Sequence, residues 1–529
     1  MVPFSLEKKE RLSGEDTKEA DTHRGVFGTK KETPPPHPRR EPRFNGPLTA
    51  DAVAGVFDKC ADFNRRMLYL NNDPNRQVEM LFIAGQVRNE RACDYVLRPL
   101  TQNEALRAAP DMDAAFDLML KGGLYSLTVE SRDTMDQVIF DLIDGSVALF
   151  FPGKAQALTL SAGTEEKRSV SDPENEPDVK GARDAFVESV RTNTSLVRRR
   201  FRAPELKVEE QIVGRQSVTP VDVLYVEGIA DPSLAEQVKA KLEQIDIDAL
   251  LMTGNLEQYV VDESHTAFPL TVYTERPDRF CAGLAEGRVG VLVDGIPMGW
   301  LFPATLDSFF RTGQDRSTSW AVAGALSVLR YVCVLVTLFL PGLYVAAVLF
   351  YPQLIPVKLN LSIIAAKADV PFHTLTEILV MLLSFEVLQE AGLRLPSSIG
   401  QTVSILGGLV VGSAAVDAKL VSPAVLVVVA IAGIAGYTAP SQDFAGALRL
   451  WRFGITIAGG FLGLTGLVLA GAALAYRLAM LETFGVAYLT PFASNAGRQK
   501  EGHTVLREPL PHVTTRPDYL NTENRRNQG

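Results

Sequence analysis

The sequence of 529 residues contains few of the residue types on which metal sites and disulfide frameworks depend. It has four cysteines, six histidines and three tryptophans. The cysteines stand far apart without a CxxC pair, which argues against a zinc site or a disulfide framework. His265 and His373 each lack a second ligand at metal spacing, so both are expected to be structural. The sequence therefore predicts no metal and no cofactor.

Motifs for nucleotide binding and acyl transfer are also missing. The chain has no G-x-x-x-x-G-K-[ST] phosphate loop, no G-x-G-x-x-G after a strand and no G-x-S-x-G elbow. An enzyme is therefore the disfavoured hypothesis, and no catalytic residue is assigned. The net charge of -9 argues against a nucleic-acid-binding protein, since such domains usually carry a strongly basic balance.

The N-terminal part shows no secretory signal, because no apolar core of roughly 7–15 residues follows a basic start. We expect this half of the chain to start in the cytoplasm. Residues 1–46 combine charge, proline and few large apolar groups, which predicts a disordered arm. Residues 161–180 are polar and acidic, and we interpret them as a linker between two folded modules, 47–160 and 181–318.

The two modules are interpreted as copies of one α/β unit. QVEMLFIAG matches PVDVLYVEG, which pairs Gly85 with Gly228, and LIDGSVALFFPG matches LAEGRVGVLVDG, which pairs Gly145 with Gly287. Each copy has a β-rich run that ends at a glycine and leads into a helical pattern, and each closes with an apolar strand. The duplication favours a scaffold or assembly module, and a ligand pocket between the copies is the alternative.

The composition changes from residue 319, and residues 319–493 are predicted to form an all-α membrane domain. The run 320–351 carries one charge in 32 residues, more than the roughly 20 residues needed to cross a bilayer. Four more apolar segments bring the predicted count to about five spans: 374–391, 399–416, 421–439 and 453–482. An odd count would put the polar tail 494–529 outside, yet this tail is also basic in places, so its side stays open.

The third apolar segment places small and polar residues on one helical face, at steps of three or four: Gln401, Ser404, Gly408, Gly412 and Ala415. Such a face belongs against water or against another helix. Gly408 and Gly412 form a GxxxG, which permits close helix packing in lipid. These residues are therefore candidates for pore lining or for helix packing, and the two roles are compatible if adjacent protomers pack around a pore.

Four charged residues fall within or beside the second apolar segment: Glu377, Glu386, Glu390 and Arg394. The last three are spaced at four residues, so a helix aligns them and Glu390 can pair with Arg394. A charge at mid-bilayer costs about 3 kcal/mol, which makes an intramembrane carboxylate a functional candidate by default. Glu377 or Glu386 is a candidate for contact with permeating cations, and an ion pair that fixes packing is the alternative.

A basic run follows an amphipathic helical pattern in the second module: Arg198, Arg199, Arg200 and Arg202. It would bind anionic lipid head groups if it faced a membrane, at about 1 kcal/mol per basic residue. The alternative is a solvated face or pairing with acidic neighbours.

Five stretches carry a longer pattern through the second module and the membrane domain: GARDAFVESVRTNTSLVRRRFRAPELKVEEQIVGRQSVTPVDVLYVEGIADPSL, FPLTVYTERPD, LAEGRVGVLVDGIP, LPGLYVAAVLFYPQLIPVKLNLSI and VPFHTLTEILVMLLSFEVLQEAGLRLPSSIGQTVSILGGLVVGSAAV. Together they resemble the A-subunit family of spore germination receptors, the GerA type, over residues 181–492. A related stage V sporulation homologue shares the RTNTSLVRRR-like region, whereas FEVLQEAGLRLPSSIGQTVSILG looks more like the receptor subunit.

The resemblance implies a multi-pass protein of the spore inner membrane, with its soluble N-terminal part on the cytoplasmic side, in the spore core. It implies assembly with a transporter-like B subunit that binds the nutrient and with a C-subunit lipoprotein. It further implies a homo-oligomer, expected to be a pentamer, that forms a nutrient-gated ion channel and triggers germination. The alternatives are a non-conducting scaffold that docks the B subunit, the stage V homologue tied to dipicolinic-acid release and, least favoured, a transporter.

Overall fold

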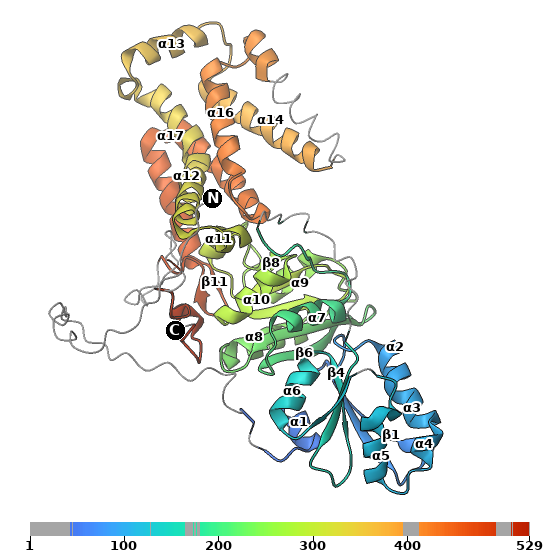
Figure 1. The fold of residues 1–529 in the computed structure, drawn as a ribbon. Helices are drawn as coiled ribbons and strands as arrows, with labels where there is room; N and C mark the ends of the chain where they lie inside the picture. The colour runs from blue at the N-terminus through green and yellow to red at the C-terminus, as the bar shows by residue number, and fades with distance from the viewer. Residues whose placement is uncertain are drawn as a thin grey trace, which may run out of the picture. The chain divides into compact units, whose positions relative to one another are not determined.

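The computed structural model describes residues 43–44, 46–126, 128–163, 173, 176, 180–394, 412–492, 509 and 512–527. All elements named below belong to the unit Phe44–Gly529. Two antiparallel five-stranded sheets come first along the chain, and a set of long helices follows them (Figure 1). The predicted α/β N-terminal half and helical C-terminal part are therefore both present.

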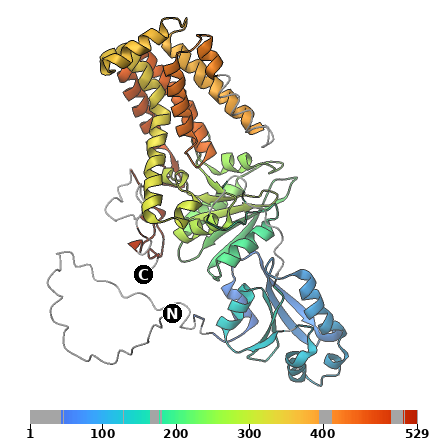
Figure 2. The same cartoon turned by 45° about the horizontal axis from the view of Figure 1, so that its top comes forward.

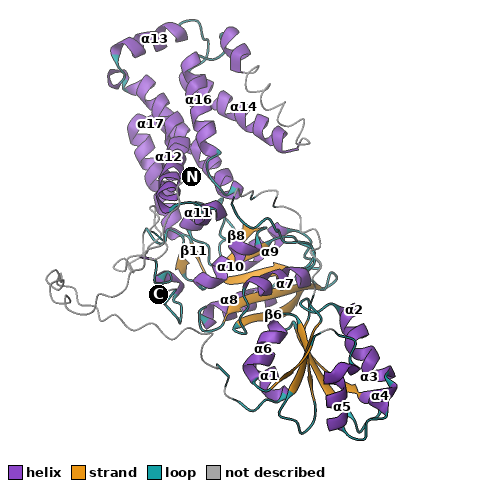
Figure 3. Cartoon of the chain, viewed as in Figure 1, coloured by secondary structure: helices purple, strands orange, loops and turns teal. Residues whose placement is uncertain are grey.

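The first module is a sheet with strand order β1-β2-β4-β5-β3 and helices on both faces (Figure 3). Alternation along β2 sends Val78 and Met80 to one face and Leu81 and Ile83 to the other, and all four are buried. The strands are β1 (Phe63–Tyr69), β2 (Gln77–Ile83), β3 (Val129–Arg132), β4 (Ser146–Phe150) and β5 (Ala157–Ser161). The helices are α1 (Ala50–Val56), α2 (Asn89–Ala92), α3 (Arg98–Gln102), α4 (Glu104–Arg107), α5 (Met112–Leu118) and α6 (Met135–Ile143), with π-helical turns at Cys93–Leu97 and Met119–Gly123.

The second module repeats this topology strand for strand, in the order β6-β7-β9-β10-β8. The glycines that the sequence alignment pairs occupy equivalent turns: φ is 82° at Gly85 and 76° at Gly228, and 92° at Gly145 and 105° at Gly287. These left-handed values favour glycine, which has no Cβ. The strands are β6 (Leu206–Val213), β7 (Thr219–Val226), β8 (Val272–Thr274), β9 (Val289–Val293) and β10 (Gly299–Phe302).

The helices of the second module begin and end at recognisable signals. Asp231 caps α8 (Pro232–Glu243) by accepting a hydrogen bond from the Ser233 amide, and Pro232 stands at the first helical position. Helix α10 (Pro277–Glu286) likewise starts with a proline and ends at the left-handed Gly287. The remaining elements are α7 (Val190–Arg200), α9 (Thr253–Val260) and the 3₁₀ turn Leu306–Phe309.

The helical domain contains α11 (Gly313–Ser317), α12 (Trp320–Phe350), α13 (Val357–Lys367), α14 (Thr374–Arg394), α16 (Pro423–Gly436) and α17 (Gln442–Met480). Helix α12 packs along both α16 and α17 (Figure 2). Among the described residues, two helices, α12 and α17, are long and apolar enough to cross a membrane. The five spans stay a prediction, and most of the third segment lies outside the described residues.

Helix α17 is a hairpin of two antiparallel helices. Gly463 has φ 62° and ψ -142°, which no helix interior allows. Beyond it the chain folds back, so that a Cβ at Gly459 would lie 3.2 Å from the Leu467 side chain. Eight residues of a straight helix would separate the two by about 12 Å. The sequence predicted one segment over 453–482, whereas the structure turns inside it.

Part of the C-terminal tail packs on the second module. Arg516 Nε donates to the Ala285 carbonyl at 2.7 Å, and the Glu523 amide donates to the Ile229 carbonyl at 3.2 Å. Asn521 Nδ2 lies 2.9 Å from Asp231 Oδ2. The described tail residues 512–527 therefore lie beside α8 and α10.

Candidate functional site

A deeply buried ion pair joins the two modules. Arg198 of α7 donates to both carboxylate oxygens of Asp62, with Nη2 2.7 Å from Oδ1, and both side chains are 1% exposed. The desolvation of two buried charges is repaid only by close, well-oriented contact. The pair therefore stabilises the contact between the two modules, which we call the joint. Removing either partner would leave the other as a buried charge without compensation.

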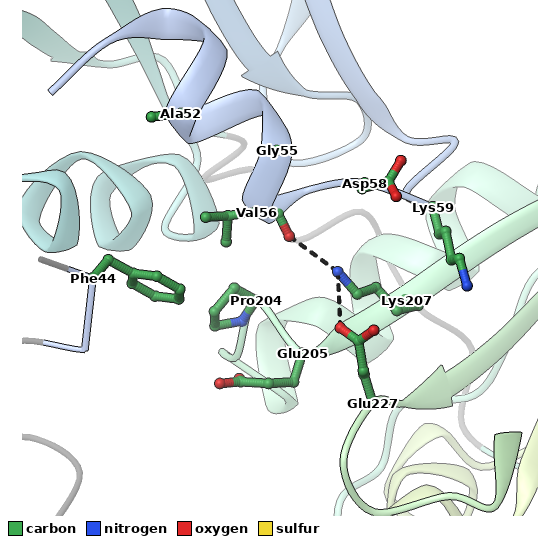
Figure 4. Close-up of a pocket in the computed structure, with 10 residues that line it drawn as sticks. All are labelled: Phe44, Ala52, Gly55, Val56, Asp58, Lys59, Pro204, Glu205, Lys207 and Glu227. Atoms are coloured by element: carbon green, nitrogen blue, oxygen red, sulfur yellow. Dashed lines mark hydrogen bonds and ion pairs between the residues drawn. The ribbon is translucent and has the colours of Figure 1, made fainter. Parts of the chain in front are cut away.

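A cavity of about 410 Å³ lies between the modules (Figure 4). Lys207 reaches across the joint: its Nζ donates to the Val56 carbonyl at 3.0 Å and lies 3.3 Å from Glu227 Oε2. The charged residues of the lining are Asp58, Lys59, Glu205, Lys207 and Glu227. The cavity thus presents two lysines and three carboxylates, contributed by both copies.

The basic run predicted as a lipid contact is largely engaged in ion pairs. Arg200 pairs with Asp184, and Arg202 Nη1 lies 2.9 Å from Asp144 of the first module. Arg198 is enclosed in the joint described above and is not available to a head group. Lipid contact stays a prediction for the exposed Arg199.

Asp222 of β7 forms a second buried network, which the sequence analysis did not predict. Its Oδ2 accepts a hydrogen bond from Thr194 Oγ1 at 2.8 Å and lies 3.2 Å from Arg191 Nη1. Burial raises the pKa of Asp222 to about 6 despite the nearby arginine. An acidic residue at an inward position of a β-rich run is the only sequence signal that could have marked it.

An aromatic cluster connects the second module to both long helices. Phe310 stacks on Tyr331 of α12 with ring centroids 4.0 Å apart, and it meets Phe444 of α17 at 5.3 Å. Phe309 stacks on the same Phe444 at 5.8 Å and contacts Tyr488, which follows α17, at 5.9 Å. Such pairs contribute about 0.5–1.5 kcal/mol each beyond their buried area. We call these five residues the aromatic junction.

Glu386 of α14 pairs with two arginines of α17. Arg452 donates to Glu386 Oε1, and Arg449 Nη1 lies 3.6 Å from Oε2. Arg452 is 2% exposed, so the pair fixes α14 against α17. Glu390 is exposed on α14, and Arg394 is the last residue of this helix. The structure therefore brings Glu386 together with partners that the sequence analysis did not identify.

Glu377, one turn into α14, is fully buried. Its Oε2 accepts a hydrogen bond from the Ser422 amide at 3.0 Å, and Lys367 Nζ lies 3.6 Å from Oε1. Ser422 directly precedes α16, so the carboxylate caps this helix start and links it to α14.

Two of the five small residues predicted for one helical face can be placed. A Cβ at the buried Gly412 would lie 3.3 Å from Leu426 of α16, and Ala415 packs against the same apolar cluster. Gln401, Ser404 and Gly408 lie outside the described residues. Within the described part of the chain, Gly412 and Ala415 therefore contribute to helix packing in the same chain.

In the described ranges no group of three or more His, Cys, Asp or Glu residues could hold a metal ion. His265 and His373 are both exposed. The features described so far in these ranges are the polar cavity between the modules, the aromatic junction and the paired charges of the helical domain.

Comparison with known proteins gives consistent matches over most of the chain. A family model described as Bacillus/Clostridium GerA spore germination protein matches residues 51–519. Spore germination protein KA of Bacillus subtilis (strain 168) is 34% identical over 464 residues, which cover 88% of this chain and 84% of that protein. Stage V sporulation protein AF of the same organism is 28% identical over 459 residues, 86% of this chain and 91% of that protein.

A solved structure also matches the N-terminal half. It is the N-terminal domain of the A subunit of the Bacillus megaterium spore germinant receptor GerK3, with 27% sequence identity and a TM-score of 0.37. The match covers 47% of this chain and 91% of that chain.

Proposed function

Because the chain belongs to the Bacillus/Clostridium GerA spore germination protein family, we propose that it is the A subunit of a nutrient germinant receptor and that its oligomer forms a nutrient-gated ion channel. Its partners would be a transporter-like B subunit that binds the nutrient and a C-subunit lipoprotein, in a pentamer of A subunits. The greater identity to the germination protein than to the stage V protein supports the receptor assignment.

The aromatic junction carries the proposal. A gated channel needs a rigid connection between the part that receives the signal and the helices that move. Phe310 of the second module contacts both Tyr331 of α12 and Phe444 in the first turn of α17. Phe309 adds a second contact with Phe444. A rotation of that module would therefore pull on both long helices at once, as a gate requires.

The arrangement of helix ends supports an even number of membrane crossings instead of five. Phe444 lies at the end of the helical domain near the second module, whereas Gly463 lies beside Phe350 and Tyr351 at the opposite end. The second half of α17 then returns, and Arg477 Nη2 lies 2.5 Å from Glu263 of the module. Both soluble modules and the tail would occupy the cytoplasmic side, with the helices in the spore inner membrane.

The ion path would follow the face 401–415, and the buried carboxylates would hold the helices around it. Glu377 and Glu386 are engaged with Ser422 and Arg452, so each already has a partner within the chain. A carboxylate enclosed in this way stabilises helix packing more readily than it meets a hydrated cation. Residues Gln401, Ser404 and Gly408 remain the candidates for lining the path.

Potassium release from purified spores after nutrient addition tests the channel. We expect Gly408→Leu to change the rate of release severalfold, or to cause leakage without nutrient, at matched protein levels. Gly454→Leu is the matched control, because Gly454 is exposed on α17 and a Cβ there meets nothing within 4 Å. Normal release from Gly408→Leu spores with normal protein levels would favour the non-conducting scaffold.

The cavity between the modules favours a second candidate function, binding of a small polar ligand. Its lining offers both amino and carboxylate groups from the two copies, which suits a ligand that carries both charges. Loss of the nutrient response in Glu205→Gln with unchanged protein abundance would support this function, and an unchanged response would leave nutrient binding to the B subunit.

A further inference from the structure

The two sheets have four edge strands, β1, β3, β6 and β8, and these edges differ in how they are protected. Residues 59–61 of the first module cover β6, because the Ala61 amide donates to the Val208 carbonyl at 2.7 Å. Just after β8, the Phe186 amide donates to the Glu275 carbonyl at 2.7 Å. Strand β3 is four residues long and carries two charges. Strand β1 has seven residues, and among the described segments β2 alone pairs along it.

The hydrogen bonds at the ends of the pairing between β1 and β2 show which main-chain groups point outward. They join Leu70 N to Arg76 O at 2.9 Å and Ala84 N to Asp62 O at 2.7 Å. Since hydrogen-bonded positions alternate in an antiparallel pair, the even-numbered residues of β1 bond to β2. The amides and carbonyls of Arg65, Met67 and Tyr69 therefore point to the open side of the sheet.

The open edge also exposes apolar surface. The side chains of Met67 and Tyr69 are 42% and 44% exposed. A cavity of about 570 Å³ lies between β1 and the helical segment 93–101, and its apolar lining includes Leu68, Leu97 and Leu100. A long edge strand with unpaired main-chain groups and exposed apolar side chains is a template for an added strand.

The charges of β1 indicate what kind of strand would fit. Arg65 is already paired, with Asp51 and Glu79. Arg66 is exposed at the rim of the cavity, and no described residue forms an ion pair with it. Arg66 lies on the same face of the strand as Leu68, because side chains two positions apart share a face. A carboxylate on the added strand would give Arg66 the partner that the chain itself does not provide.

A second copy of β1 does not meet this requirement. If two β1 strands paired antiparallel over all seven residues, Arg66 would lie directly opposite Arg66 of the other copy. The two would form a non-hydrogen-bonded pair, in which opposite side chains are closest, and like charges in that position are destabilising. The charge of the edge therefore favours an acidic segment over a second copy of this chain.

We propose that β1 binds an extended acidic segment of a partner protein as an added antiparallel strand. The main chain of this segment would pair with Arg65, Met67 and Tyr69, and a carboxylate would lie opposite Arg66. An apolar side chain two positions before the carboxylate would lie opposite Leu68 and enter the cavity beside Leu97 and Leu100. This inference goes beyond the receptor function proposed above and does not depend on ion conduction.

Peptide binding to the full-length chain in detergent tests this edge. The probe is the dye-labelled peptide TVLVEVT, the matched peptide is TVLVKVT, and fluorescence anisotropy measures both affinities. We expect wild-type protein to bind the glutamate peptide about tenfold more tightly than the lysine peptide. Arg66→Glu should reverse this preference.

Substitutions at Met67 separate main-chain pairing from side-chain contact. Met67→Pro removes an outward amide and leaves the bonds to β2 in place, so binding should weaken at least about tenfold. Met67→Ala keeps the amide and is the matched control, with an expected loss of about threefold or less. Wild-type protein should also fail to bind a glutamate peptide methylated at the amides of its valines, which tests the pairing even where Met67→Pro lowers the unfolding temperature.

Three results would overturn the proposal and leave the receptor function standing. The first is equal affinity of wild-type protein for the two peptides, or binding of neither at millimolar concentration. The second is full binding of the methylated peptide. The third is a wild-type dimer in analytical ultracentrifugation that Met67→Pro converts to a monomer, because the edge would then belong to a second copy.

Discussion

The two modules share one strand order and differ in what each equivalent position touches. Glu79 of β2 corresponds to Asp222 of β7: Glu79 is 24% exposed and pairs with Arg65 at the surface, whereas Asp222 is fully buried beside Arg191. The same frame thus carries an ordinary surface pair in one copy and a buried titratable group in the other. The two modules therefore share their backbone topology, whereas equivalent side chains have different surroundings in the two copies.

The paired glycines show the same divergence. A Cβ at Gly145 would lie 2.9 Å from the Gln86 carbonyl of its own module, whereas a Cβ at Gly287 would strike the side chain of Thr522 in the tail. The turn is closed by local backbone in the first module and by a distant segment in the second. The first module is therefore largely self-contained, and the second serves as the junction for the tail, the helices and the other copy.

Breaking the contact between the copies should have the largest effect. Replacing Arg198 by Ala leaves Asp62 charged and buried, so we expect the free energy of unfolding to fall by about 3–5 kcal/mol. Chemical denaturation of the purified full-length protein measures this loss. Arg215→Ala breaks an exposed pair and should cost less than about 1 kcal/mol. Similar losses for both variants would mean that the Arg198 pair does not hold the joint.

The second largest effect concerns the equivalent positions Asp222 and Glu79. The free energy of unfolding should depend on pH through Asp222. Because the folded pKa of Asp222, about 6, is raised above its usual 3.8, the folded chain keeps a proton that the unfolded chain releases between these values. Its contribution to the free energy of unfolding is therefore present at low pH and is lost as pH rises from about 4 to 6, by about 3 kcal/mol.

Asp222→Asn should remove this contribution. The difference in unfolding free energy between variant and wild type, measured by denaturation from pH 4 to pH 7, should then change with pH. Glu79→Gln is the control at the equivalent position in the first module. A difference for Asp222→Asn that stays constant over this range would contradict the assignment.

The smallest expected effect is a difference in stability between substitutions at the two paired glycines, Gly145 and Gly287. Gly145→Ala and Gly287→Ala should each cost about 1–2 kcal/mol from the left-handed backbone alone. Thr522→Ser removes the methyl that a Cβ at position 287 would meet, so it should relieve part of the cost of Gly287→Ala and none of that of Gly145→Ala. Double-mutant cycles on thermal unfolding check this, and equal coupling at both glycines would argue against tail contact.

Local patterns in the sequence predicted much of the fold. The near-constant offset of two motif pairs indicated a duplicated unit, and the paired glycines occupy equivalent turns because backbone conformation is encoded by neighbouring residues. The change of composition near residue 319 located the start of α12 at Trp320. The turn inside α17 was missed, since Gly463 lies in an unbroken apolar run that also contains other glycines.

Contacts between distant residues were not predictable in the same way. Arg198 and Asp62 are 136 residues apart, so the sequence does not indicate that they pair. A basic run without known partners is usually interpreted as a surface feature. Arg452 directly precedes the predicted segment 453–482, and nothing in the sequence indicates that it pairs with Glu386 of another helix. One chain without relatives shows which side chains are unusual but not which of them meet.

The tail has a consequence for how the protein is made. Residues 512–527 emerge from the ribosome only after the long helices, yet they complete hydrogen bonds to Ile229, Asp231 and Ala285. A prematurely terminated chain would keep both sheets but expose the bare turn at Gly287. The surface of the second module beside α8 and α10 is therefore completed last during synthesis, by a segment that follows every other described element in the chain.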